Sequence, residues 1–144
     1  KVVSMSLETP SVYITNSPEE TAKIASEFAK SIKPGDCLAL YGEMGAGKTV
    51  FVSGLAKGLG IAADVTSPTF SLMNVYGPVY HFDLFRLTEQ EAEDEGLDEY
   101  ACDKTKISVI EWPKDSLLPP GAIKVKFEII GENTRQISIY RCKE

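Results

Sequence analysis

A glycine-rich segment that follows a short apolar run constrains this chain more than any other feature. Residues 38–41 read Leu-Ala-Leu-Tyr, and residues 42–49 read Gly-Glu-Met-Gly-Ala-Gly-Lys-Thr, which matches the pattern G-x-x-x-x-G-K-[ST]. The glycines of this pattern let successive backbone N–H groups point at phosphate oxygens. Residues 50–59 predict a helix, whose positive dipole end would face the same phosphates. The segment therefore predicts a strand, a phosphate-binding loop and a helix.

This loop supplies the first candidate site residues. In loops of this kind the lysine reaches the β- and γ-phosphates and the last hydroxyl ligates Mg²⁺. Lys48 is therefore a candidate for phosphate binding and catalysis, and Thr49 is a candidate metal ligand. We expect the nucleotide to be bound by residues Glu43, Met44, Gly45, Ala46, Gly47, Lys48, Thr49 and Val50.

Two further helix starts can be read from local chemistry. Asn16 or Ser17 can cap a helix that has Pro18 in its first turn, where a missing N–H costs nothing. Thr88 can cap a second helix, with Glu91 three residues later as its capping-box partner.

Apolar spacing in the rest of the chain predicts an α/β protein. Strands are predicted over residues 12–15, 70–76, 79–85, 107–110, 123–129 and 135–140. Helices and strands alternate early and strands pair late, so we expect a mixed parallel and antiparallel central sheet flanked by helices. The expectation is one P-loop NTPase-like domain over residues 1–144, with residues 1–10 disordered or derived from the expression vector.

Composition narrows the classes of function. The chain has 21 acidic residues against 15 lysines and arginines, and no basic stripe is visible, which argues against tight direct contact with nucleic acid.

No apolar run approaches the roughly 20 residues of a membrane span, and the first residues lack a signal-peptide core. Cys37, Cys102 and Cys142 show no C-x-x-C spacing, and Cys37 is typical of a core position rather than a nucleophile. We expect a cytoplasmic protein with no membrane contact.

A triphosphatase also needs a carboxylate at a strand end, to position Mg²⁺ or water. Two predicted strands end in one: residues 79–82 precede Asp83, and residues 107–110 precede Glu111. Either acid can hold the magnesium shell or orient the attacking water, and spacing alone does not divide these roles.

Several neighbouring residues admit two interpretations. His81 is a packed or surface histidine rather than a catalytic base, because phosphoryl transfer depends mostly on positioning and charge stabilisation. Arg86 either stabilises transition-state charge or lies on the surface, and Trp112 either packs over the site or lies in the core. The acidic segment 89–99 is a solvated helix face or a docking surface for a basic partner.

Features that the sequence lacks help to predict which base the protein binds and which type of reaction it supports. The tetrapeptide Asn-Lys-x-Asp, which reads guanine in small GTPases, does not occur, and its absence favours adenine. Few arginines and no lid segment count against a small-molecule kinase, which stays an alternative. A second alternative is a binding module in which ATP orders residues 67–69 to recruit a partner.

Four segments in order along the chain together resemble the TsaE (YjeE) family, the small ATPases of bacterial tRNA threonylcarbamoyl-adenosine synthesis. They are the loop at 42–49, Ser-Pro-Thr-Phe at 67–70, Tyr-His-Phe-Asp-Leu-Phe-Arg-Leu at 80–87 and Ile-Glu-Trp at 110–112. The resemblance runs from about Ser17 to Tyr140. It departs at Val50, where the family usually has a second threonine, and at Lys114, where an acid is common.

The resemblance implies an ATPase that uses ATP and Mg²⁺ and works with a TsaD–TsaB complex. The partners would supply most contacts to tRNA, and weak self-association is left open. By motif match, Thr49 and Glu111 would ligate Mg²⁺, and Asp83 would be the acid essential to hydrolysis.

The same resemblance implies the rest of the site. Residues that border the adenine would be Pro18, Thr21 and Arg135. Residues that sense the nucleotide state and the partner would be Ser67, Pro68, Thr69, Arg86 and Trp112.

Overall fold

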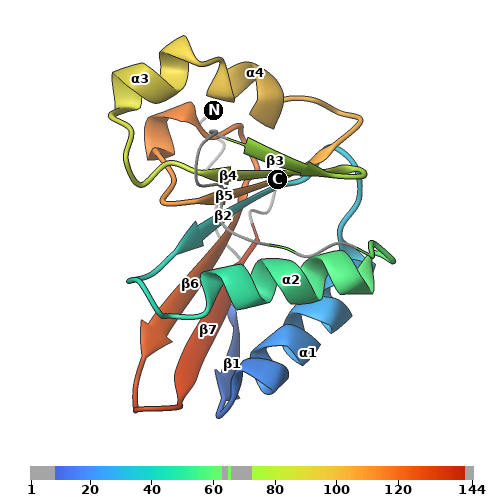
Figure 1. Ribbon diagram of the computed structural model, residues 1–144, viewed down its shortest axis with the longest axis vertical. Coiled ribbons are helices and arrows are strands. Elements are labelled where there is room, and N and C mark those ends of the chain that lie inside the picture. Colours follow the sequence, from blue (N-terminus) through green and yellow to red (C-terminus); the bar gives the residue numbers. More distant parts are fainter. Residues whose placement is uncertain (1–8, 63–64, 66–72, 142–144) are drawn as a thin grey trace, which may run out of the picture.

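A seven-stranded sheet forms the centre of the protein (Figure 1). The computed structural model describes residues 9–62, 65 and 73–141, so the predicted segment Ser67–Thr69 and the start of the predicted strand 70–76 lie outside the described residues. The strand order is β1-β7-β6-β2-β5-β4-β3. The strands are β1 (Ser11–Thr15), β2 (Cys37–Tyr41), β3 (Met73–Tyr76), β4 (Val79–Asp83), β5 (Ile107–Glu111), β6 (Ile123–Ile129) and β7 (Arg135–Tyr140).

The sheet is mixed, which confirms the predicted fold class. Its central strands β6, β2, β5 and β4 are parallel, whereas β1, β7 and β3 pair antiparallel with their neighbours. Parallel strands end at the same edge of a sheet. In the register of the central strands, Glu111 lies opposite Asp83 on one side and Leu40 on the other. Both candidate acids therefore lie at the edge where β2 leads into the glycine-rich loop.

Helices cover both faces of the sheet. They are α1 (Pro18–Phe28), η1 (Ala29–Ser31), α2 (Lys48–Gly58), α3 (Glu89–Asp94), α4 (Leu97–Ala101) and η2 (Asp115–Leu117). Figure 1 shows α1 and α2 side by side below the central strands, and α3 and α4 above them. One buried cluster joins α1 and α2 to the sheet through residues such as Phe51 and Leu55, and a second joins α3 and α4 to it through Phe82 and Leu97. Within the described part of the chain, no helix has the length and apolar character to cross a membrane.

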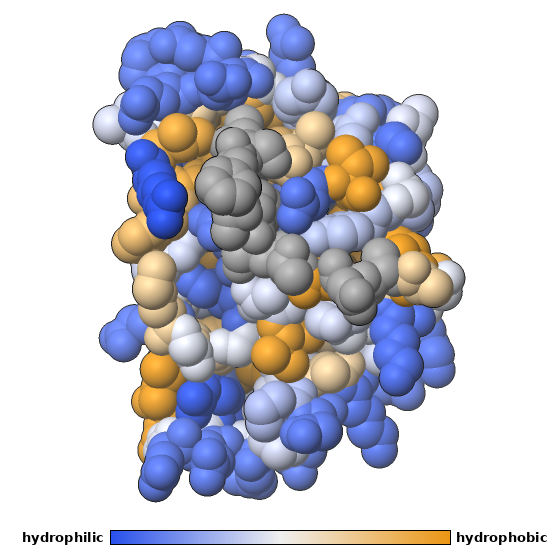
Figure 2. All heavy atoms as spheres, viewed as in Figure 1, coloured by the Kyte–Doolittle hydropathy of each residue, from blue (hydrophilic) through white to orange (hydrophobic). Residues whose placement is uncertain are grey.

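Local capping chemistry explains where two helices begin. The Ser17 hydroxyl accepts a hydrogen bond from the Glu20 N–H at 3.1 Å, and Pro18 occupies the first turn of α1. Thr88 and Glu91 form the predicted capping box at the start of α3. The acidic segment forms two short helices rather than one, because Gly96, at φ +82°, ends the first. Figure 2 shows hydrophilic residues gathered over this end of the molecule.

Cys37 is a core residue, as its position at a strand start indicates. Its side chain is buried, and this burial, together with the nearby Cys102 and Asp36, raises the pKa of the thiol to about 12. The thiol therefore stays protonated at neutral pH and is a poor nucleophile.

Helices α1 and α2 are in direct backbone contact. A Cβ atom built on Gly54 would lie 2.3 Å from the Ala22 carbonyl oxygen, and one on Gly58 would lie 2.5 Å from the Ser26 carbonyl oxygen. These glycines are thus required by the close approach of the two helices. The contact positions the first turn of α2, which carries Lys48 and Thr49.

We expect Gly54→Ala to lower the free energy of unfolding by about 1–3 kcal/mol, because the added methyl group must push α1 away from α2. Ser53→Ala is the matched control on the exposed side of the same helix, and it should change stability by less than about 0.5 kcal/mol. Urea unfolding followed by circular dichroism measures both. Equal stabilities for the two variants would contradict the close packing.

Candidate functional site

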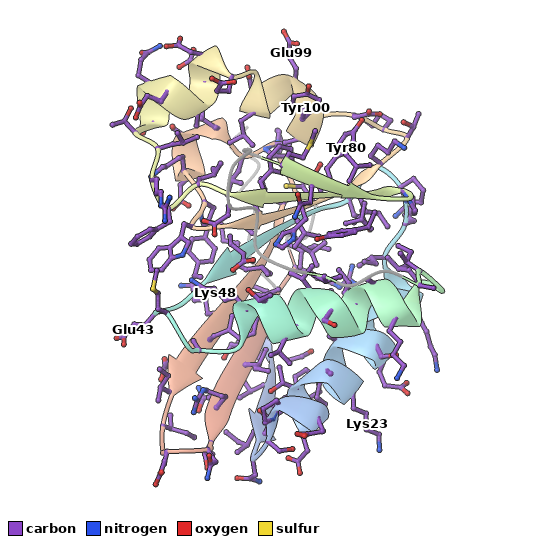
Figure 3. All side chains as sticks on the ribbon, in the orientation of Figure 1. Lys23, Glu43, Lys48, Tyr80, Glu99 and Tyr100 are labelled. Carbon is purple, nitrogen blue, oxygen red and sulfur yellow. The ribbon has the colours of Figure 1, made fainter. Side chains whose placement is uncertain are left out.

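The loop before α2 adopts a conformation that depends on glycine. Gly45 and Gly47 have φ angles of +80° and +102°, in the left-handed region that favours glycine. Gly47 is the N-cap of α2, so Lys48 is the first residue of the helix, where backbone N–H groups have no acceptor within the helix. Figure 3 shows Lys48 at this position and Glu43 farther out on the loop. The result is a helix N-terminus prepared to bind an anion.

The Lys48 ammonium is buried and compensated by several groups. It donates a hydrogen bond to the Gly42 carbonyl oxygen and lies 3.6 Å from the centroid of the Trp112 ring. Burial lowers the pKa of Lys48, and the nearby carboxylates of Glu111 and Asp83 oppose this shift. The amine is thus held among a ring face, a carbonyl oxygen and two acids.

Trp112 packs over the site. Its backbone has φ +54°, which is unusual for a residue with a bulky side chain, and its ring contacts Phe85 with the centroids 4.8 Å apart. Of the two interpretations of Trp112, the structure therefore favours the one that places it over the candidate site, beside Lys48.

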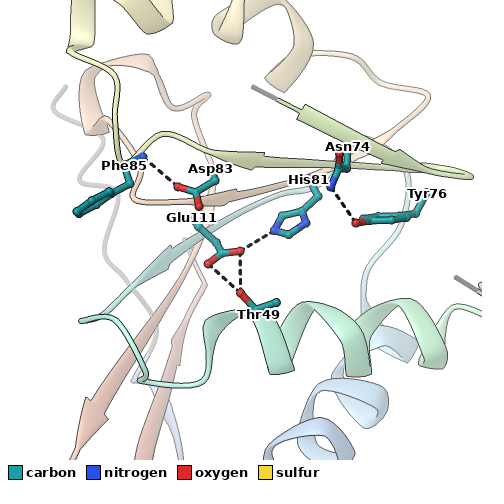
Figure 4. A network of polar contacts seen from close by, with 7 residues as sticks. All are labelled: Thr49, Asn74, Tyr76, His81, Asp83, Phe85 and Glu111. Atoms are coloured by element: carbon teal, nitrogen blue, oxygen red, sulfur yellow. Dashed lines mark hydrogen bonds and ion pairs between the residues drawn. The ribbon is translucent and has the colours of Figure 1, made fainter. Parts of the chain in front are cut away.

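Glu111 lies at the centre of a polar network (Figure 4). Its carboxylate is only 3% exposed, and its Oε2 atom lies 2.6 Å from Nε2 of His81. The Thr49 hydroxyl lies 3.5 Å from both carboxylate oxygens, at the limit of a hydrogen bond. A carboxylate and a helix-start hydroxyl therefore converge at one point.

Asp83 takes a different position at the end of the neighbouring strand. It is half-buried, and its Oδ1 atom accepts a hydrogen bond from the Phe85 N–H at 3.0 Å. It contributes to the electrostatic environment of Lys48. Between these two described residues, no hydrogen bond joins Asp83 to Thr49, so the two acids differ in their surroundings.

The donor set fits Mg²⁺ held jointly with phosphates. Mg²⁺ prefers oxygen ligands and is bound through one or two protein groups, substrate phosphates and water. Thr49 and Glu111 supply a hydroxyl and a carboxylate close together. Within the ranges that the structure describes, no group of three or more His, Cys, Asp or Glu side chains would hold a metal alone.

Two adjoining cavities flank the loop. The first, of about 330 Å³, is lined by Met44, Gly45, Gly47, Lys48, Thr49, Val50 and Glu111. The second, of about 130 Å³, is lined by Ser17, Pro18, Thr21, Gly45, Gly47, Val50, Asn133 and Arg135. They share the glycines of the loop and Val50, so one continuous surface connects the Lys48 end to the N-terminus of α1.

Arg135 fixes one wall of the second cavity. Its guanidinium donates to the Gly45 carbonyl oxygen at 3.1 Å and to those of Gly131 and Thr134 at 3.0 Å. The hydroxyl of Thr21 is bonded to that of Thr15 at 2.8 Å. Arg135 thus ties the loop to the turn between β6 and β7.

The remaining candidates lie around this centre. The Glu43 side chain is exposed, whereas Ala46 is buried in the hydrophobic core, so neither side chain lines a cavity. Arg86 is exposed and makes no hydrogen bond or ion pair with the described residues. The contact of His81 with Glu111 is what sequence reasoning missed. The signal available was its spacing of two residues from Asp83, which puts both on one face of a strand.

The chain is similar over most of its length to proteins of one family. The family model for TsaE, described as threonylcarbamoyl adenosine biosynthesis protein TsaE, matches residues 15–137. The chain is 42% identical over 130 residues to the tRNA threonylcarbamoyladenosine biosynthesis protein TsaE of Bacillus subtilis, covering 86% of this chain and 81% of that protein. It is 36% identical over 137 residues to the protein of the same name from Aquifex aeolicus, covering 89% and 94%. The crystal structure of Bacillus subtilis YdiB superposes with a TM-score of 0.81 at 33% identity, over 97% of this chain and 90% of that one.

Because Trp112 is the single tryptophan and lies on the Lys48 amine, its fluorescence should report what binds Lys48. We expect ATP with Mg²⁺ to change the emission, since phosphates would draw the amine away from the ring. Lys48→Ala should abolish the ATP-dependent change, whereas Lys57→Ala, at the far end of α2, should keep it. ATP binding seen by calorimetry without any change in emission would contradict this expectation.

Proposed function

This chain belongs to the TsaE family, and from that membership we propose that it is the ATP-binding and ATP-hydrolysing subunit required for threonylcarbamoyl-adenosine modification of tRNA. Its relatives carry names that place them in this biosynthesis. The observation that carries the proposal is the pair of adjoining cavities at the glycine-rich loop, with Lys48, Thr49 and Glu111 in the first.

The first cavity suits the triphosphate. The N–H groups at the start of α2 and the Lys48 ammonium would bind phosphate oxygens, because both present positive charge to the same space. Lys48 would exchange the Gly42 carbonyl and the Trp112 ring for these oxygens. Thr49 and Glu111 would hold Mg²⁺, which when bound neutralises charge on the β- and γ-phosphates.

Asp83 is the better candidate for orienting the attacking water. It ends the strand next to Glu111, yet it is not engaged with Thr49 and is more exposed than Glu111. In hydrolysis the water oxygen forms a bond to the γ-phosphorus, and the bond from that phosphorus to the β–γ bridging oxygen breaks. ADP and inorganic phosphate result, and the Asp83 carboxylate would accept a hydrogen bond from the water as it attacks.

The second cavity suits the adenine. It lies across the loop from Lys48 and is bordered by the Pro18 ring, the Thr21 side chain and the Arg135 guanidinium. The Thr21 hydroxyl is already bonded to Thr15, which leaves its methyl group for an apolar contact. The lining combines polar side chains such as Ser17 and Asn133 with the apolar side chain of Val50, which would suit a flat base such as adenine.

The partner proposal rests on the family and on charge. We assign the partner role to a TsaD–TsaB complex, with tRNA contacted mainly through these partners. A net charge of −6 opposes direct binding to the phosphates of RNA. Arg86 is exposed and makes no hydrogen bond or ion pair with the described residues, and Trp112 lies next to Lys48; both features support a role for these two residues toward the partner.

We expect slow phosphate release from ATP by the protein alone and strong stimulation by the cognate TsaD–TsaB pair with tRNA. Lys48→Ala should remove nucleotide binding. Asp83→Ala should keep binding and lower turnover by about a hundredfold or more, because the water loses its orienting acid. Steady-state phosphate release and calorimetric ATP binding measure these effects.

Glu27→Ala, which removes an exposed acid of α1 remote from the loop, is the matched charge control and should behave as wild type. Normal hydrolysis by the Asp83 variant would refute its assigned role. No stimulation by an active partner pair would favour the small-molecule kinase, to be tested with metabolite acceptors. Undiminished product formation over many cycles with Asp83→Ala would favour a nucleotide-gated binding module.

A further inference from the structure

The buried carboxylate of Glu111 needs a partner, since an unpaired charge at 3% exposure is costly. Its contacts with the Thr49 hydroxyl are 3.5 Å long and therefore weak. Its contact with His81 Nε2 is 2.6 Å, the shortest that its side chain makes with any described residue. Among the described residues, the histidine is accordingly the nearest hydrogen-bond partner of this carboxylate.

His81 has no other polar partner in the described part of the chain. Its side chain is fully buried, its ring lies 6.1 Å from that of Tyr76 between centroids, and its Nδ1 atom has no hydrogen-bond partner. A proton on Nδ1 would be a buried donor without an acceptor, so the neutral tautomer with its proton on Nε2 fits the site. That N–H donates to Glu111 Oε2, in a hydrogen bond strengthened by the negative charge of the acceptor.

Strand pairing fixes the direction from which the imidazole approaches. His81 lies opposite Val109, two residues before the Asp83–Glu111 pair on the same face of the sheet. The imidazole therefore reaches Glu111 from the interior, while Thr49 lies on the side of the loop cavity (Figure 4). Because His81 contacts Oε2 from the interior, the other lone pairs of the carboxylate are available to a ligand in the cavity.

We propose that His81 is a positioning residue that sets the orientation of the Glu111 carboxylate toward Mg²⁺ bound with the nucleotide. The histidine touches neither the metal nor the nucleotide and acts through Glu111. A partner of this kind, which holds a ligating side chain in place, changes metal affinity by about 10–100-fold when removed. The inference rests on the proposed function, because it concerns the magnesium site of the same nucleotide complex.

The test measures the apparent Mg²⁺ affinity, by titrating MgCl₂ into the protein saturated with fluorescent ADP. His81→Leu should weaken Mg²⁺ binding by about tenfold or more. Affinity for the nucleotide without Mg²⁺ should change less than about twofold, because Glu111 is the only hydrogen-bond partner of the His81 side chain among the described residues. This split separates a positioning role from a general loss of structure.

Two amide variants make the test independent of simple packing. His81→Gln can place an N–H near the position of Nε2 and should retain near wild-type Mg²⁺ affinity. His81→Asn carries the same group on a shorter side chain that does not reach, and it should resemble His81→Leu. Val109→Ala, directly across the strand pair and buried, is the structural control: it should lower the urea midpoint and leave Mg²⁺ affinity unchanged.

A double-mutant cycle with Glu111→Gln tests the route of action. In the Glu111→Gln background, His81→Leu should cause no further loss of Mg²⁺ affinity, since the carboxylate that it positions is absent. Additive losses would overturn the proposal. So would wild-type Mg²⁺ affinity in both His81→Leu and His81→Asn, or equal losses in the Gln and Asn variants.

The proposed function fails in a different way. If wild-type protein binds fluorescent nucleotide with no dependence on Mg²⁺, both the magnesium site and the inference are wrong. If the wild type shows magnesium-dependent binding and the variants match it, only the inference is wrong.

Discussion

The parallel pairing of β2, β5 and β4 is the constraint on which the rest of the site depends. It aligns Glu111 between Leu40 and Asp83, so that both acids end beside the loop that leaves β2. Side chains alternate along a strand, and a register shift of one residue would turn a strand's side chains to the other face. His81 and Asp83 would then point at α3 and α4 instead of α2. The chemistry of this edge is thus a consequence of strand order and register.

A second set of contacts holds the loop and the helix that follows it. The backbone approach of α1 to α2 at Gly54 fixes the axis of the helix that begins with Lys48. Within the loop, Arg135 donates to the carbonyl oxygen of Gly45. Because these contacts come from α1 and from β7, the loop is supported by elements distant in sequence. A phosphate-binding loop that is positioned before the ligand arrives loses less conformational entropy on binding.

The parts of the structure that the sequence predicted are those governed by local chemistry. Loop spacing identified the strand, turn and helix around Lys48. Side-chain caps predicted a start of α1 at Asn16 or Ser17, of which Ser17 is the cap, and a start of α3 at Thr88. Alternation predicted β6 because one face of this strand is buried along Ile123, Val125 and Phe127, and it predicted β7, although Ser138 is buried there together with Ile137 and Ile139.

What the sequence did not predict depends on contacts between distant elements. The bond from His81 to Glu111 requires knowing that β4 lies beside β5, and the place of Trp112 depends on a left-handed backbone at one residue. Gly96 also divides the acidic segment where composition indicated one helix, since glycine readily adopts positive φ. The assignments to Ser67–Thr69 stay predictions, because these residues lie outside the described ranges.

The surroundings of Lys48 determine what a nucleotide must replace. A buried ammonium needs compensation, and the Gly42 carbonyl, the Trp112 ring and two nearby carboxylates supply it. A cation–π contact contributes about 0.5–2 kcal/mol, and a hydrogen bond to a charged group about 1.5–3 kcal/mol. Contacts with phosphates would have to be more favourable than the contacts that Lys48 gives up. Only the difference between these two free energies would contribute to the affinity for a nucleotide. Since Trp112 supplies part of what would be lost, its packing against Phe85 would influence the affinity for the proposed nucleotide without any contact with the phosphates.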